Sequence, residues 1–256
     1  MTVPPNNVNE ESPVNSQPRM IQVKLPGSVK TPWATYILIG VTVVVYLLQL
    51  LSQSLLGGDV VAYLGEKINA LIIQGEVWRL ITPLFLHGSI LHIGFNMYAL
   101  FAIGPSLERA YGHKRFLLLY FLAGFAGNTL SFLLSPAASL GASTAIFGLI
   151  AAEVIFIYRN RQIFGARARG MLMNLGMIIV VNLLLGLSPG IDNWGHLGGL
   201  VGGAIFAWIA GPVYQLGTGE AGYELQDKHA GVHVAEGTMV TFGLFVAVVI
   251  GRILAG

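Results

Sequence analysis

Residues 37–51 read ILIGVTVVVYLLQLL, a stretch without a single charged side chain. The hydrocarbon core of a bilayer is roughly 30 Å thick, and about 20 mostly apolar helical residues are needed to cross it. With its flanks, this stretch extends over about 33–55 and is the most uniformly apolar part of the chain. It therefore predicts a membrane-spanning helix.

Further apolar runs follow it along the chain, near 89–107, 115–135, 142–158, 170–188, 194–214 and 238–255. Several contain Gly, Ser, Asn or His, which is typical of membrane helices packed among other helices. Of the 256 residues, 54% are hydrophobic and 10% are charged, whereas soluble domains carry roughly 25% charged residues. We therefore expect an all-α, polytopic membrane bundle, and a soluble enzyme or a disordered chain is disfavoured.

Charge and residue usage also restrict the chemistry. The net charge of +2 is too small to indicate a nucleic acid as partner. The chain has no cysteine, which excludes disulfides, thiolate metal sites and cysteine nucleophiles. It contains no Walker-type loop, dinucleotide fingerprint or His-Glu-x-x-His motif. We therefore expect neither a cofactor nor a metal.

The Lys and Arg residues gather in alternate loops between the predicted spans. Eleven of the 14 fall on the side of the N-terminus, and only Lys67, Arg79 and Arg252 fall on the other side. Because cytoplasmic loops carry the excess of Lys and Arg, we expect a cytoplasmic N-terminus in the cell membrane. With seven spans, the C-terminus is extracytoplasmic, and the half-apolar loop at about 56–88 lies partly in the outer interface.

Four polar side chains lie within predicted spans, where such groups are costly and therefore candidates for function. They are His92, Asn96, Ser143 and His196. The second, fourth and sixth spans all begin on the outer side, so the four residues share a depth of at most about 10 Å below that surface. This agreement in depth indicates a single site.

Ser143 and His196 are suited to be a nucleophile and its base. A serine hydroxyl needs an adjacent base to become nucleophilic, and the N–H groups at a helix N-terminus can stabilise the oxyanion that forms. The glycines of Gly195–Gly203 leave a flat helix face, so the sixth span can press against the fourth. Taken alone, Ser143 could instead be a packing residue and His196 a core histidine.

Three further residues complete the expected site. His92 and Asn96 stand at i and i+4, on one helix face, and both can donate hydrogen bonds to an oxyanion. They could also simply tie the first loop to the bundle. Phe147 lies one turn beyond Ser143 on the same face and could hold the His196 ring in place.

Taken together, these motifs resemble the rhomboid family of intramembrane serine proteases. The resemblance covers about residues 75–212 and rests on Trp78-Arg79, His92-x-x-x-Asn96, Leu107-Glu108-Arg109-Ala110-Tyr111-Gly112, Arg115-Phe116-Leu117, Gly141-x-Ser143 and Gly195-His196-x-x-Gly199-x-x-x-Gly203. It implies a core of six spans with a Ser–His dyad, no third acidic member, and a water-filled cavity open to the outer face.

Residue by residue, the resemblance implies Ser143 as nucleophile and His196 as base. It implies an oxyanion hole formed by His92, Asn96 and the Ser143 N–H, with Phe147 packed on the base. Structural roles fall to Gly141, Gly199 and Gly203 and to Trp78 and Arg79, which we expect to anchor the outer loop. The family usually has glycine after the serine, and here Thr144 follows it.

The resemblance also suggests a division of the chain. Residues 1–30, rich in Pro, Asn and Ser, are expected to form a disordered cytoplasmic tail. The six-span core is expected over 31–214, a cytoplasmic linker over 215–237, and an additional C-terminal transmembrane helix over 238–256.

The expected function is that of an intramembrane serine endopeptidase, which cleaves transmembrane substrates near the extracytoplasmic face. Its partners are then transmembrane protein substrates and the lipid bilayer, and the sequence does not indicate an oligomeric state. The alternative is a catalytically inactive rhomboid-like protein that binds transmembrane clients. A transporter or channel is disfavoured, because the polar cluster is one-sided and the chain shows no convincing internal repeat.

Overall fold

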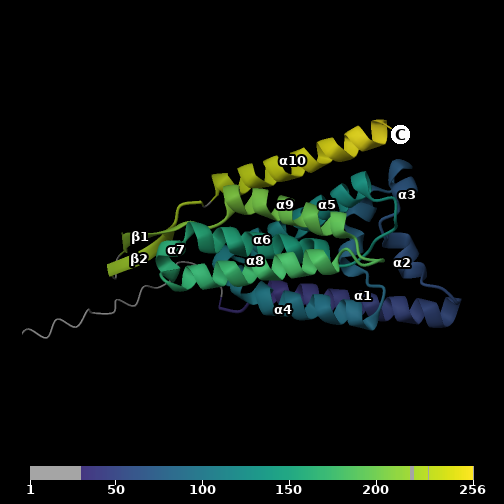
Figure 1. Ribbon diagram of the computed structural model, residues 1–256, viewed down its shortest axis with the longest axis horizontal. Helices are drawn as coiled ribbons and strands as arrows, with labels where there is room; N and C mark the ends of the chain where they lie inside the picture. The colour runs from purple at the N-terminus through teal and green to yellow at the C-terminus, as the bar shows by residue number, and fades with distance from the viewer. Residues whose placement is uncertain (1–29, 220–221, 230, 256) are drawn as a thin grey trace, which may run out of the picture.

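The computed structural model describes residues 30–219, 222–229 and 231–255 as a bundle of long helices (Figure 1). The tail expected over 1–30 lies, except for its last residue, outside the described residues. The long helices follow the predicted spans in order: α1 (Trp33–Leu56), α4 (Ile90–Tyr111), α5 (His113–Leu134), α6 (Ser143–Arg159), α8 (Arg167–Leu185), α9 (Asn193–Ala210) and α10 (Val232–Leu254). The expectation of a polytopic helical bundle is therefore confirmed.

Shorter elements connect the long helices. Between α1 and α4 lie α2 (Val60–Gly65), α3 (Asn69–Ile73), η1 (Val77–Leu80) and η2 (Thr82–Phe85), and α7 (Arg161–Phe164) lies between α6 and α8. An antiparallel hairpin, β1 (Tyr214–Gly219) and β2 (Gly222–Asp227), precedes α10. The segment expected as a linker thus contains a hairpin and the first turns of α10.

Helices α1, α4, α5, α8 and α10 are each long and apolar enough to cross a membrane. The other two predicted spans, α6 and α9, have 17 and 18 residues. These two pack against each other and against α5, so the three form the centre of the bundle. Around them, α10 lies along α9 and α5, α8 lies along α6, and α1 lies along α4 (Figure 1).

Glycines let the central helices approach closely. A side chain on Gly203 of α9 would collide with the backbone of Gly148 in α6. A side chain on Gly199, one turn earlier, would collide with the carbonyl oxygen of Thr144. Two of the glycines expected to be structural therefore lie where α9 meets α6, as close helix packing in membranes requires.

The start of α1 is held by a buried carboxylate on α4. Glu108 accepts hydrogen bonds from the backbone N–H groups of Ala34 at 2.9 Å and Thr35 at 2.8 Å. The first N–H groups of a helix have no partner within it, and a negative charge there is favourable. The His113 ring at the start of α5 also contacts this carboxylate, so three helices are fastened at one end of the bundle.

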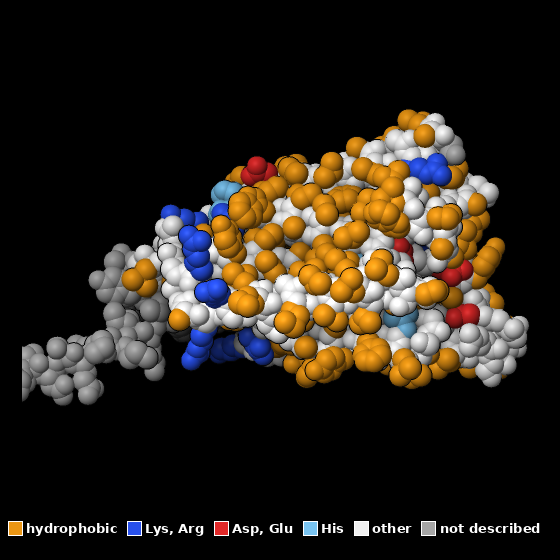
Figure 2. All heavy atoms as spheres, viewed as in Figure 1, with side chains coloured by type: hydrophobic (Ala, Val, Ile, Leu, Met, Phe, Trp, Pro, Cys, Tyr) orange, Lys and Arg blue, Asp and Glu red, His pale blue; other side chains and the backbone are white. Residues whose placement is uncertain are grey.

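The two ends of the bundle differ in charge. Hydrophobic side chains cover the middle of the face seen in Figure 2, and Lys and Arg side chains gather at the end that carries the hairpin. We call this the basic end; the ends of α6 and α9, α7 and the start of α8 also lie there. The opposite end carries α2, α3 and the last residues of α10 (Figure 1), and we call it the α2–α3 end.

Candidate active site

Ser143 and His196 meet at the α2–α3 end of the bundle. Ser143 is the first residue of α6, and His196 lies in the first turn of α9. The Ser143 Oγ and His196 Nε2 atoms are 3.0 Å apart, within hydrogen-bond distance, although 53 positions separate the residues. The structure therefore brings together a hydroxyl and an imidazole in the geometry that a nucleophile and a general base need.

The turn before Ser143 requires a glycine. Gly141 has a φ of +135°, a conformation that residues with a side chain rarely adopt. A Cβ at this position would also lie 2.7 Å from His92 Nε2 and 3.7 Å from Ser143 Oγ. Gly141 therefore serves two purposes, because it makes the turn and it leaves room for the His92 ring beside the nucleophile.

Thr144, which follows the serine, fits between α5 and α9. It is 5% exposed. A Cβ at Gly127 of α5 would lie 2.6 Å from the Thr144 Cβ, and one at Gly195 of α9 would lie 2.9 Å from its Cγ2. Both neighbouring helices thus provide the space that the larger residue needs.

The Phe147 ring stacks on the His196 imidazole. Their centroids are 4.2 Å apart and their planes differ by 11°. His196 is 8% exposed, and its Nδ1 atom has no hydrogen-bond partner among the described residues. The ring is therefore oriented by its stacking on Phe147 and by its hydrogen bond with Ser143. No carboxylate among the described residues binds it.

Asp192 fixes the first turn of α9, and the sequence motifs do not identify it. Its Oδ1 accepts the N–H of Gly195 at 3.0 Å, and its backbone carbonyl accepts the N–H of His196 at 3.2 Å. The Ser131 hydroxyl of α5 donates to the other carboxylate oxygen. An aspartate directly before the first residue of a helix is a capping pattern, and this is the sign of the role of Asp192 in the sequence.

His92 and Asn96 lie on one face of α4, as their spacing predicts. Ser89 caps the helix by accepting the N–H of His92 at 3.1 Å. The Asn96 amide donates to the His92 carbonyl oxygen at 2.9 Å, and the residue is 7% exposed. The His92 ring faces Gly141, so it adjoins the turn that carries Ser143.

A second histidine, His87, supports the same turn and has no role in the sequence-based prediction. The Ala142 N–H points at its Nε2 atom at 3.4 Å, and its ring lies edge-on to the His92 ring at 5.0 Å. The Gln49 side chain of α1 binds both the N–H and the carbonyl of His87, at 3.0 and 3.2 Å. His87 therefore links α1 to the residue before the nucleophile.

Trp78 and Arg79 belong to the connection between α1 and α4. Arg79 is 2% exposed; its guanidinium donates to the carbonyl oxygens of Tyr63 at 2.7 Å and Glu66 at 2.8 Å and pairs with Glu76. The Trp78 indole donates to a carbonyl of α2, that of Leu64, at 3.2 Å. Both residues thus hold α2 against η1, and the structure does not bring them to the dyad.

Lys67 and Asn69 fasten this connection to the end of α5. The Lys67 ammonium donates to the Ser135 carbonyl at 3.1 Å, and the Asn69 amide donates to the same oxygen at 2.9 Å. Lys67 is fully buried. Its burial lowers the pKa of Lys67 to about 8, and the charge of Asp192 opposes this shift.

Comparisons with known proteins find relatives of this chain. The family described as "Rhomboid domain" matches residues 74–213, more than half of the chain. The rhomboid protease GluP of Bacillus subtilis (strain 168) is 41% identical over 181 residues, which are 70% of this chain and 35% of GluP. RHOMBOID-like protein 9, chloroplastic, of Arabidopsis thaliana is 34% identical over 198 residues, 74% of this chain and 45% of that protein.

Rhomboid-like protease 3 of Toxoplasma gondii is 41% identical over 132 residues, which are 50% of this chain and 49% of that protein. The chain therefore spans about a third to a half of the length of these curated relatives.

Proposed function

The chain belongs to the rhomboid family, and on this premise we propose that it is a serine endopeptidase that cleaves transmembrane protein segments within the membrane. The observation that carries the proposal is the 3.0 Å distance between Ser143 Oγ and His196 Nε2. The stacking of Phe147 on the imidazole supports it further, because a base must be held in one orientation to accept the proton.

The proposed reaction is acyl transfer in two stages. His196 Nε2 accepts the proton of the Ser143 hydroxyl as Oγ attacks the peptide carbonyl, and the resulting imidazolium then protonates the leaving amine. In the second stage, water attacks the acyl-enzyme with His196 again as base, and the serine is released. Asp192 caps α9 and lies outside the proton transfer.

The oxyanion of the tetrahedral intermediate needs donors beside Ser143. The Ser143 N–H is one, because the first N–H groups of a helix lack an intrahelical acceptor. The His92 ring adjoins the turn at Gly141, and the Asn96 amide carries a second hydrogen besides the one it gives to the His92 carbonyl. Each such donor typically lowers the barrier by roughly 2.7–4 kcal/mol.

The charge distribution supports an extracytoplasmic site. The arginines of 159–169 lie at the basic end, whereas Ser143 and His196 lie at the α2–α3 end. Since cytoplasmic loops carry the excess of Lys and Arg, the N-terminal side of α1 faces the cytoplasm. The dyad then lies near the outer face of the cell membrane, and α10 ends on that side.

The depth of the dyad restricts the substrate. Backbone carbonyls in a transmembrane helix are hydrogen-bonded and shielded, so a substrate helix must unwind locally before Oγ can reach a carbonyl. Segments that contain glycine form weaker helices. We therefore propose substrates with a locally weak helix and a small residue at the cleavage point.

The alternative function is that of a rhomboid-like protein that binds transmembrane clients without cutting them. Its only support is Thr144, which stands where the family usually has glycine. The packing of Thr144 against Gly127 and Gly195 favours the active enzyme, because the larger residue is accommodated without separating Ser143 from His196.

The test uses the full chain in proteoliposomes with a model transmembrane substrate and a fluorophosphonate probe. Wild type is expected to cleave the substrate and to be labelled, and Ser143→Ala is expected to lose both. His196→Ala should lose cleavage, and Ser188→Ala, at an exposed position, should behave as wild type. Turnover by Ser143→Ala would remove the assigned nucleophile, and wild type without cleavage or labelling would favour the alternative.

A further inference from the structure

A groove of about 1030 Å³ lies at the basic end, between the ends of α6 and α9 and the helices α7 and α8. Its polar lining includes three arginines, Arg159, Arg161 and Arg169, and Gln162. Among the described residues that line it, none is an Asp or Glu. The groove therefore concentrates positive charge and is suited to an anion.

Two of the arginines are available to a ligand. Arg161 and Arg169 make no salt bridge within the described residues. The Arg161 guanidinium lies over the Tyr158 ring, 5.4 Å from its centroid, so it is oriented by a cation–π contact. Arg159 is engaged differently: it lies over the Trp208 ring at 5.2 Å, and it donates to the Trp208 carbonyl.

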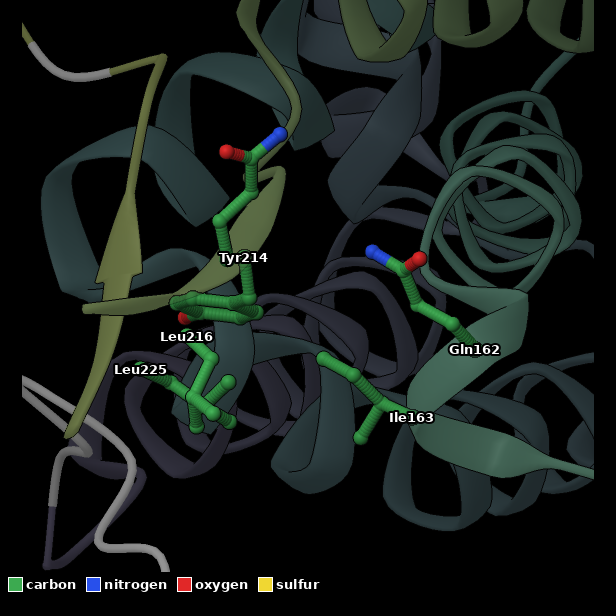
Figure 3. Close-up of a pocket in the computed structure, with 6 residues that line it drawn as sticks. Gln162, Ile163, Tyr214, Leu216 and Leu225 are labelled. Atoms are coloured by element: carbon green, nitrogen blue, oxygen red, sulfur yellow. The ribbon is translucent and has the colours of Figure 1, made fainter. Parts of the chain in front are cut away.

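The hairpin lies on the other side of α7. Ile163 of α7 faces Leu216 and Leu225 of the hairpin across a smaller pocket of about 460 Å³ (Figure 3). The Asp227 carboxylate of the hairpin pairs with Arg115 at 2.9 Å. The Asp227 carboxylate is therefore already paired with Arg115, and it does not line the groove of Arg161 and Arg169.

The groove opens onto an apolar strip that runs along α8. The lining of the groove includes Met173, which is also the first residue of this strip. Met173, Met177, Val180 and Leu184 are all exposed, and they follow one another at helical spacing along one face of α8. Tyr158 and Trp208, at the rim, are about half exposed, and such aromatic residues are typical of the boundary between bilayer and water.

We propose that this groove binds an anionic phospholipid, with the phosphate between Arg161 and Arg169 and an acyl chain along the Met173–Leu184 face of α8. Guanidinium groups bind phosphate oxygens with two parallel hydrogen bonds, and basic pockets between membrane helices on the cytoplasmic side bind lipid headgroups. The apolar strip argues for a lipid, since free phosphate would leave it unused. The proposal is independent of the chemistry at Ser143.

The experiment measures bound lipid on the purified full chain by native mass spectrometry. Phosphatidylglycerol and phosphatidylcholine with the same acyl chains are added in turn to the protein in detergent. We expect phosphatidylglycerol to be retained at least tenfold better than phosphatidylcholine. The double variant Arg161→Gln/Arg169→Gln should lose that preference.

The matched control is Arg109→Gln/Lys114→Gln, which removes one exposed cation from the end of α4 and one from the start of α5, also at the basic end but outside the groove. It should bind phosphatidylglycerol as wild type does. Equal retention of the two lipids by wild type, or an equal loss in both double variants, would overturn the proposal. Displacement of phosphatidylglycerol by millimolar inorganic phosphate would identify a phosphate site and would also overturn it.

The folding of both double variants is checked by circular dichroism and by fluorophosphonate labelling of Ser143. If Arg161→Gln/Arg169→Gln loses helicity, the single variants Arg161→Lys and Arg169→Lys replace it. Each keeps the charge but lacks the planar guanidinium, so a smaller loss of phosphatidylglycerol is expected. Unchanged binding in both of them would contradict the proposed phosphate contacts.

Discussion

Asp192 accepts the backbone N–H of Gly195 at 3.0 Å, directly before the proposed base His196. The same carboxylate accepts the Ser131 hydroxyl of α5. The first turn of α9 is therefore held both by its own cap, Asp192, and by Ser131 of the neighbouring helix. The position of the His196 imidazole depends on both contacts.

Replacing this cap should affect turnover more than substrate binding. Asp192→Ala removes both acceptors, and the loss of a cap alone costs about 1 kcal/mol, so we expect lower thermal stability and a clear fall in kcat with little change in KM. Asp192→Asn keeps an oxygen for the Gly195 N–H and an amide for the Ser131 hydroxyl, so it should restore most of kcat. If Asn is as damaging as Ala, the capping account is wrong.

Phe147→Ala should slow the reaction without unfolding the bundle. The stacked ring holds the His196 imidazole, and aromatic pairs of this kind contribute about 0.5–1.5 kcal/mol. We therefore expect kcat to fall by about two- to tenfold, measured on a model transmembrane substrate. Phe147→Tyr keeps an aromatic ring and should retain activity. A wild-type rate in Phe147→Ala would show that stacking does not orient the base.

The sequence draws attention to four polar residues because they share one depth in the predicted spans. His92, Asn96, Ser143 and His196 stand out as polar groups in apolar helices, and the structure places all four at the α2–α3 end. His87 does not stand out, because it lies in the turn before α4, and its contacts come from Gln49 and Ala142, which are distant in sequence. Tertiary contacts of this kind leave no local pattern.

The sequence also does not predict the hairpin or the first turns of α10. The strands β1 and β2 are short, and strand preference depends on packing context. Here the context is supplied by Arg115, which pairs with Asp227, and by Asn160, which accepts the Tyr214 N–H at 2.8 Å. Helix α10 begins at Val232, before the apolar run at 238, because hydropathy marks only the part of a helix that crosses the hydrocarbon core and not the turns outside it.

Gly199→Ala should separate α6 from α9. Any Cβ at this position would collide with the carbonyl oxygen of Thr144, the residue after the nucleophile. We expect a marked fall in thermal stability and the loss of Ser143 labelling by a fluorophosphonate. Gly176→Ala on α8 is the control, because nothing lies within 4 Å of its added Cβ. Alanine is preferred to glycine inside a helix by about 1 kcal/mol, so the control should be neutral or stabilising.

Lys67 should make the stability of the bundle depend on pH. Its burial lowers the pKa of Lys67 from 10.5 to about 8, so the unfolded chain binds this proton more tightly than the folded one. Stability therefore rises with pH between about 8 and 10.5, because in this window the folded protein has released the proton and the unfolded chain still holds it. Below pH 8 the buried ammonium is charged in both states and the gain is absent.

The difference of 2.5 pH units corresponds to at most about 3 kcal/mol. Lys67→Met keeps a long side chain that cannot titrate, so its thermal unfolding in detergent should lack this component. The measurement is the change in Tm between pH 7.5 and pH 10 for wild type relative to Lys67→Met, which cancels the titration of all other groups. Parallel changes in the two proteins would show that Lys67 is solvated in the folded state and that the connection between α1 and α4 is less tightly closed over α5 than its hydrogen bonds indicate.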